Sequence, residues 1–130
     1  EVAQLGPSAN VDQALRRWFS PQYRQKNVSY IAALRQSVIA NHTPSYLVCY
    51  RLFAQGDNIA KQHLGNITCP TLVTTGELDP GSTPAMSRAL AAQLNQAQVV
   101  ILADARHMMP VENAPQVNHL LVQFINACDA

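Results

Sequence analysis

The chain has 130 residues, of which 48% are hydrophobic and 13% are charged, and its formal net charge is +1. These values are typical of one folded domain, whole or incomplete, and exclude a disordered segment. The charged residues form no Lys/Arg cluster and the apolar runs are short, which argues against nucleic acid or a membrane as a partner. Residues 1–10 lack the pattern of a signal peptide, so we expect a cytoplasmic protein.

The cysteines and histidines do not have the spacing of a metal site. Cys49, Cys69 and Cys128 are odd in number and widely separated, which favours buried thiols in a reducing compartment over disulfides or zinc. The histidines show no paired-ligand spacing either; they are His42, His63, His107 and His119. We therefore expect no metal site.

The first half of the chain is predicted to be helical after an irregular segment over residues 1–10. Apolar residues at helical spacing, separated by capping residues, prolines and glycines, predict four helices. They cover about residues 11–19, 28–40, 43–56 and 57–65. Ser20-Pro21 is expected to end the first helix, Gly56 the third, and Asp57 is expected to cap the fourth.

The second half has the pattern of a βαβα unit. Residues 71–75 and 98–102 are short apolar runs typical of buried parallel strands, and a helix from Thr83 to about Leu94 joins them. Its buried side is expected to carry Met86, Leu90 and Leu94. A last helix that begins near Pro115 is expected to pack flat on the sheet through Val117, Leu120, Leu121, Phe124 and Ile125. The change of pattern divides the chain into residues 1–65 and 66–130.

One acid and one histidine follow the two predicted strands. Asp79 lies in an Asp-Pro-Gly turn and His107 in the next loop, so each can serve a structural purpose by itself. As a pair they indicate a catalytic site more strongly than either residue alone. One helix and one strand separate them, so both leave the same edge of a parallel sheet. A carboxylate there accepts the imidazole hydrogen and orients the ring, which predicts the acid and base of a Ser-His-Asp triad.

Residues 70–125, from "PTLVTTGELDPG" to "HLLVQFI", resemble the carboxyl-terminal end of the α/β-hydrolase fold, in which the acid follows the penultimate strand and the histidine follows the last. The segments "RWFSPQYRQ" and "TPSYLVCYRLFAQGD" resemble a helical cap, most of all that of 3-oxoadipate enol-lactonase-like members. The resemblance implies an α/β class chain with a partial α/β-hydrolase fold. A helical cap segment over residues 1–65 precedes the last two parallel strands with their helices over residues 66–130.

The same resemblance implies that Asp79 is the triad acid and His107 the triad base. The nucleophile is missing, because no serine in the chain stands in a Gly-x-Ser-x-Gly segment. We therefore expect two thirds of a triad, completed by an amino-terminal half of the hydrolase. The chain by itself is expected to be inactive.

Several other residues are candidates for supporting roles. Glu112, five positions after His107, is expected to accept backbone amides or a nearby donor and so to hold the histidine loop, although it can also be a solvated glutamate. Trp18, Tyr50, Phe53 and Met108 are candidates for lining an apolar substrate site. For the aromatic residues, ordinary core packing is the alternative.

Two functions remain open at this stage. The first is a cofactor-free hydrolase of an ester, lactone or related small acyl compound, without a choice between lactonase, esterase, carbon-carbon bond hydrolase, haloperoxidase or dehalogenase chemistry. The second is a helical interaction module that pairs with another copy of the chain or a partner strand through an open sheet edge.

Overall fold

The computed structural model describes residues 6–128, without the side chains of residues 57–60. The chain divides into two compact units. A helical unit comprises the residues up to Arg16 together with Pro21–His63, and an α/β unit comprises Arg17–Ser20 together with the chain from Leu64 onward. These units differ from the expected parts 1–65 and 66–130 chiefly because Arg17–Ser20 belongs to the α/β unit.

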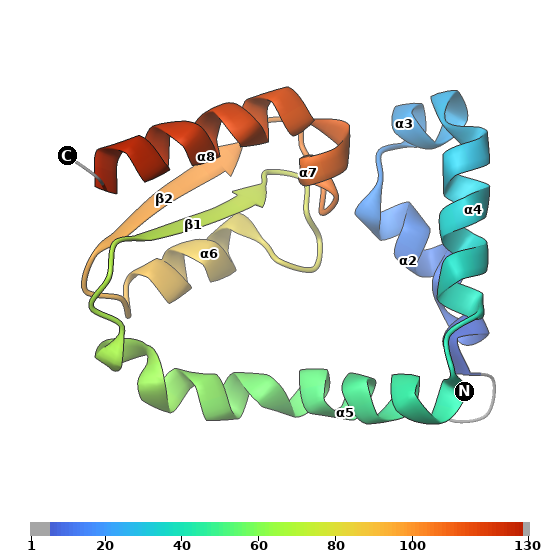
Figure 1. Cartoon of the computed structure of the whole chain (residues 1–130), viewed down its shortest axis with the longest axis horizontal. Helices are drawn as coiled ribbons and strands as arrows, with labels where there is room; N and C mark the ends of the chain where they lie inside the picture. Colours follow the sequence, from blue (N-terminus) through green and yellow to red (C-terminus); the bar gives the residue numbers. More distant parts are fainter. Residues whose placement is uncertain (1–5, 129–130) are drawn as a thin grey trace. The chain divides into compact units, whose positions relative to one another are not determined.

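Helices of different lengths follow one another in the helical unit (Figure 1). They are η1 (Gly6–Ala9), α2 (Val11–Trp18), α3 (Pro21–Lys26), α4 (Val28–Ile39) and α5 (Thr43–Ala60). The predicted apolar stripe of α2 supplies a small core, in which Val11, Ala14 and Leu15 are buried. Pro21 ends the α2 segment as predicted, but it also begins α3, a helix that was not predicted. A proline fits the first helical position because its missing N–H has no partner there.

Two helices predicted over residues 43–56 and 57–65 are replaced by one α-helix, α5, followed by the 3-10 helix η2 (Lys61–Asn66). The predicted stop at Gly56 is wrong, because a glycine inside a helix costs only about 1 kcal/mol and does not by itself end it. The predicted cap at the Asp57 side chain lies outside the described residues, as do residues 1–5 of the irregular first segment. The described part of that segment forms η1.

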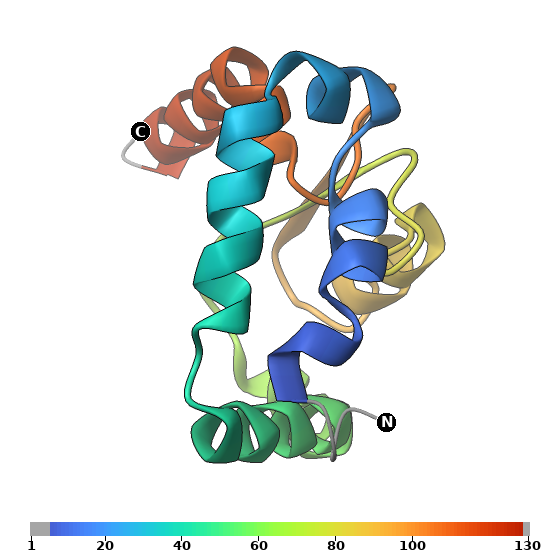
Figure 2. The same cartoon turned by 90° about the vertical axis from the view of Figure 1, so that its right-hand side faces the viewer.

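The α/β unit has the predicted βαβα order, with one short helix, α7 (Met109–Glu112), in place of part of the loop predicted after the second strand. Strands β1 (Thr71–Gly76) and β2 (Ala97–Leu102) pair in parallel, with Thr71 opposite Ala97 and Gly76 opposite Leu102. Helix α6 (Pro84–Ala91) joins them, and its Thr83 cap accepts a hydrogen bond from the Met86 amide. The remaining element is α8 (Ala114–Cys128). Helices α6 and α8 lie on opposite faces of the two strands (Figures 1 and 2).

The two helices meet the sheet differently from the prediction. Helix α6 buries Ser87 and Ala91, whereas Met86 is 54% exposed and Leu90 is also exposed, so the predicted buried side is wrong. Small residues on the buried face let this helix approach the strands closely. On α8, Val117 is buried and packs with Leu102 and Met109, as predicted, but Leu121 and Ile125 are exposed. A sheet of two strands is too narrow to cover the whole apolar stripe of α8.

Two further predictions of burial are wrong. All three cysteines are exposed: Cys49 lies on α5, Cys69 precedes β1 and Cys128 ends α8. The core-packing alternative also fails for Tyr50 and Phe53, because both side chains are exposed on α5. Helix α5 contributes little to the core of its unit, so apolar residues along it remain at the surface.

None of the described helices combines the length and the apolar composition needed to cross a membrane.

Candidate active site

The candidate site lies where β1 and β2 end. Gly76 and Leu102 are paired at the carboxyl ends of the strands, so the loops that follow leave the sheet side by side. The loops are joined by backbone hydrogen bonds from Glu77 N to the Leu102 oxygen (2.8 Å) and from Leu78 N to the Ala105 oxygen (2.9 Å). These bonds fix the separation of the two loops that carry Asp79 and His107.

Gly76 allows this close approach. A side-chain Cβ at Gly76 would overlap the carbonyl group of Ala105 and would lie 2.8 Å from the Arg106 oxygen. Because backbone atoms cannot move away as a flexible side chain does, only glycine fits here. The last residue of β1 is therefore part of the site, although it contributes no functional group.

Hydrogen bonds from two backbone amides hold the Asp79 carboxylate in the first loop. Its side chain is almost fully buried, and Oδ1 accepts hydrogen bonds from the Gly81 amide (2.8 Å) and the Ser82 amide (3.0 Å). The buried Thr75 hydroxyl donates to the Ser82 carbonyl oxygen (2.7 Å) and fixes the same turn from β1. The same hydrogen bonds thus fix both the predicted Asp-Pro-Gly turn and the position of the carboxylate. They leave Oδ2 free to accept a hydrogen bond from a further donor.

That donor is His107. Its Nδ1 lies 2.8 Å from Asp79 Oδ2, which is the predicted hydrogen bond between the acid and the histidine. An ionised carboxylate only accepts, so Nδ1 carries the hydrogen and Nε2 is left as the basic nitrogen of the neutral ring. The His107 side chain is 43% exposed while that of Asp79 is 3% exposed. A reactant can therefore reach the ring, but water has little access to the carboxylate behind it.

The surroundings of Asp79 keep it ionised. Burial raises the pKa of its carboxyl, but hydrogen bonds from the Ser82 amide, the His107 ring and the Gly81 amide lower it by more. The pKa of Asp79 is therefore lowered overall, because each of these donors favours the charged form of the carboxyl. At neutral pH the site thus contains a carboxylate that orients the imidazole and can stabilise its protonated form.

Segment Arg17–Ser20 reaches the histidine loop from far away in the sequence. The Trp18 ring stacks on the His107 ring, with 6.4 Å between the centroids and 24° between the planes. The Met108 amide donates to the Trp18 carbonyl oxygen (2.9 Å), and Glu112 Oε1 accepts from the Ser20 amide (2.7 Å). Glu112 thus accepts a backbone amide and ties the Trp18 segment to α7, beside the histidine.

The structure distributes the predicted substrate-lining residues over both units. Trp18 contacts His107, and half-buried Met108 follows it directly in the chain. Tyr50 and Phe53 belong to the helical unit, and their place at a substrate site stays a prediction. No sequence pattern singled out Thr75 and Gly76, and their only signal was their place at the end of the strand before Asp79.

No protein-family model matches the chain. Among curated proteins it is 31% identical, over 118 residues, to (E)-2-((N-methylformamido)methylene)succinate hydrolase of Acinetobacter baylyi. That match covers 89% of the chain and 43% of the relative. It is also 26% identical to 3-oxoadipate enol-lactonase 1 of the same organism, over 85% of the chain and 41% of the relative. The chain thus spans less than half the length of these two relatives.

Solved structures of hydrolases have the same fold. The chain superposes on an enol-lactonase from Burkholderia xenovorans with a TM-score of 0.78 and 26% identity, over 96% of the chain and 47% of the enzyme. A thermophilic esterase from Thermogutta terrifontis gives a TM-score of 0.78 at 23% identity, over 99% of the chain and 47% of the esterase. The second likeness concerns the fold alone.

Proposed function

Since the chain belongs to the α/β-hydrolase superfamily and has a partial α/β-hydrolase fold, we propose that Asp79 and His107 are the acid and the base of a catalytic triad. The whole enzyme hydrolyses an ester, a lactone or a related small acyl compound. The observation that carries the proposal is the 2.8 Å hydrogen bond between Asp79 and His107 at the ends of neighbouring parallel strands. The relatives named above are hydrolases, which supports the reaction class.

The proposed mechanism uses His107 twice. Its Nε2 takes the proton of a serine hydroxyl as the oxygen attacks the acyl carbon, and gives that proton to the leaving oxygen. It then takes a proton from a water molecule that attacks the acyl-serine ester, and returns a proton to the serine oxygen as the acid is released. Asp79 holds the ring and stabilises the imidazolium formed between these steps. The serine and the backbone amides that bind the oxyanion come from residues outside this chain, because no Gly-x-Ser-x-Gly segment occurs in it.

The test compares histidine variants with a short-chain p-nitrophenyl ester. The chain by itself is expected to give no turnover above that of its His107→Ala variant. In the enzyme reconstituted with the amino-terminal half of the hydrolase, His107→Ala should lower kcat/KM by about 10³-fold or more. His119→Ala is the matched control, since His119 is exposed on α8. Turnover by the isolated chain that survives His107→Ala, or a reconstituted His107→Ala enzyme as active as the control, contradicts the proposal.

The two-stranded sheet supports a second candidate function. Within the described residues, β1 and β2 pair only with each other, so each strand has one edge without a partner. Open edges recruit further strands. The alternative is therefore an interaction module that binds a partner strand or a second copy of the chain. A Gly-x-Ser-x-Gly segment encoded upstream of Glu1 favours the hydrolase, and a start codon directly before it favours the module.

A reducing, cytoplasmic location is part of the proposal. The three cysteines are free and exposed, and exposed thiols are typical of a reducing compartment rather than of oxidising surroundings. Immunodetection after cell fractionation tests this. Recovery of the protein outside the cytoplasm contradicts it.

A further inference from the structure

A cleft of about 350 Å³ lies within the helical unit, apart from the residues proposed for catalysis. Helices α2, α3 and α4 supply its lining. The lining residues are Asp12, Leu15, Arg16, Arg24, Val28, Ile31, Ala32 and Arg35. Its volume is within the range of small-molecule sites, at the lower end. One part of the wall is thus apolar and the other carries three arginines and one aspartate.

The wall of this cleft carries more positive than negative charge. Asp12 Oδ1 accepts from Arg35 Nε (2.8 Å) and Oδ2 accepts from Arg35 Nη2 (3.2 Å). The hydrogen bond from Arg35 is the main reason that the pKa of Asp12 is lowered, and the charges of Arg35 and Arg16 act in the same direction. One carboxylate therefore serves two guanidinium groups, and Arg24 brings a third positive charge to the cleft.

Arg24 has a polar atom that needs a partner. Its Nε is buried, and no hydrogen-bond acceptor lies within reach of it in the described part of the chain. A buried donor of a charged group without an acceptor is costly, and the cost falls when an anion accepts its hydrogen. The excess of positive charge and the Arg24 guanidinium group that carries this donor belong to the same cleft wall. One bound carboxylate beside this group balances the charge.

We propose that the cleft binds the carboxylate of a small organic acid. Arg24 donates to one carboxylate oxygen, and Arg16 contributes a second positive charge. A planar carboxylate matches the fork of donors on a guanidinium group, as the Asp12–Arg35 pair in the same wall illustrates. Leu15, Val28 and Ile31 cover the hydrocarbon part of the ligand, which favours an organic acid over a bare inorganic anion.

The test uses benzoate as the probe and benzamide as its uncharged counterpart. Each is titrated into the full 15N-labelled chain, and backbone amide shifts are followed by NMR. Benzoate should give saturable shifts concentrated in α2, α3 and α4, and benzamide should bind at least about tenfold more weakly, since a hydrogen bond between charged groups is lost. Arg24→Gln should weaken benzoate binding by a similar factor.

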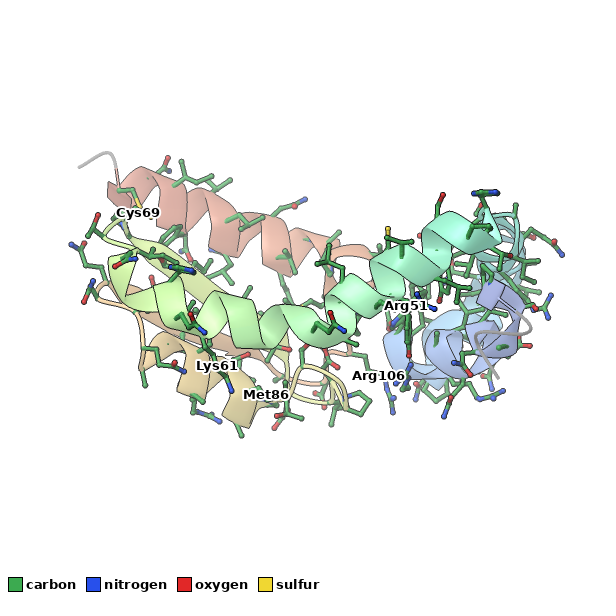
Figure 3. All side chains as sticks on the ribbon, turned by 90° about the horizontal axis from the view of Figure 1, so that it is seen from below. Arg51, Lys61, Cys69, Met86 and Arg106 are labelled. Atoms are coloured by element: carbon green, nitrogen blue, oxygen red, sulfur yellow. The ribbon has the colours of Figure 1, made fainter. Side chains whose placement is uncertain are left out.

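The matched control is Arg51→Gln. Arg51 lies on α5, outside the cleft lining, and its removal changes the net charge by the same amount (Figure 3). Arg16→Gln is a second cleft variant in case Arg24→Gln does not fold, and it should also weaken binding. Equal affinity for benzoate and benzamide overturns the proposal. So do shifts that do not saturate up to the solubility limit, and cleft variants that bind as tightly as Arg51→Gln.

Discussion

At the scale of single residues, Asp79 has the most tightly defined surroundings of the candidate site. One carboxylate oxygen accepts from two backbone amides and the other faces His107 Nδ1. The backbone bonds hold the side chain in its own loop, so the position of the carboxylate does not depend on its bond to the histidine alone. Its contribution is therefore both to the local fold and to the orientation of the imidazole.

Asp79→Asn is expected to lower the free energy of unfolding by about 1–3 kcal/mol near neutral pH, because bonds to a buried charge are lost. The folded-state pKa of Asp79 is depressed, so its stabilising contribution is present above the unfolded value of about 3.9 and is lost as the pH falls through the folded value. Urea unfolding of both proteins between about pH 5 and pH 2 should thus show a shrinking difference. Asp104→Asn, at an exposed position, is the control. A difference that stays constant over this range contradicts the argument.

At the scale of elements, small residues set the spacing of β1, α6 and the two loops that carry Asp79 and His107. Ser87 and Ala91 form the buried face of α6, while the longer Met86 side chain points away from the helix into solvent (Figure 3). Gly76 ends β1 against the Ala105 carbonyl. Small residues thus bring a helix and a loop close to the same strand. The loop carries the candidate base, His107, two residues after Ala105.

Gly76→Ala should destabilise the chain by about 1–3 kcal/mol or more, because the new methyl group overlaps backbone atoms. It should also displace His107, which would appear as shifted NMR resonances of its ring. Gly56→Ala is the matched control: nothing lies within 4 Å of the added methyl, and alanine in a helix should stabilise by about 0.5–1 kcal/mol. Thermal unfolding of both variants measures the difference. Equal midpoints would contradict the steric role of Gly76.

At the scale of the whole molecule, the sheet has two strands and is too narrow to cover the apolar stripe of α8. The outer edge of β1 can be identified from its hydrogen bonds. Thr71 and Glu77 donate toward β2, so by strand alternation Thr74 presents its amide to the opposite side. Within the described residues no strand pairs with this edge, which favours a further strand beside β1.

We expect the isolated chain to associate as its concentration rises, through the edge of β1. Thr74→Pro removes the outward amide without removing a bond to β2, and should shift the chain toward the monomer. Thr74→Val keeps that amide and serves as the control. Multi-angle light scattering measures the masses, and circular dichroism checks that each variant is folded. A wild-type chain that remains a stable monomer at millimolar concentration would contradict both edge pairing and the need for a complementing half.

The sequence by itself determined the order of β1, α6, β2 and α8 in the second half and the pairing of Asp79 with His107. Both depend on local information: apolar periodicity marks the strands, and the carboxyl ends of neighbouring parallel strands must lie together. The helical character of the first half and the stripe of α2 are of the same kind. A resemblance carried by the same residues indicated the fold.

Only the tertiary structure decided which faces are buried and which distant segments meet. Ser20 and Glu112 are 92 positions apart, and no local pattern predicts that they bond or that Trp18 stacks on His107. Helical spacing places Met86 and Leu90 on one face of α6, but the narrow space above the strands accepts the face with Ser87 and Ala91. Burial depends on the volume that other elements leave free, and that volume is set by contacts between segments remote in the sequence.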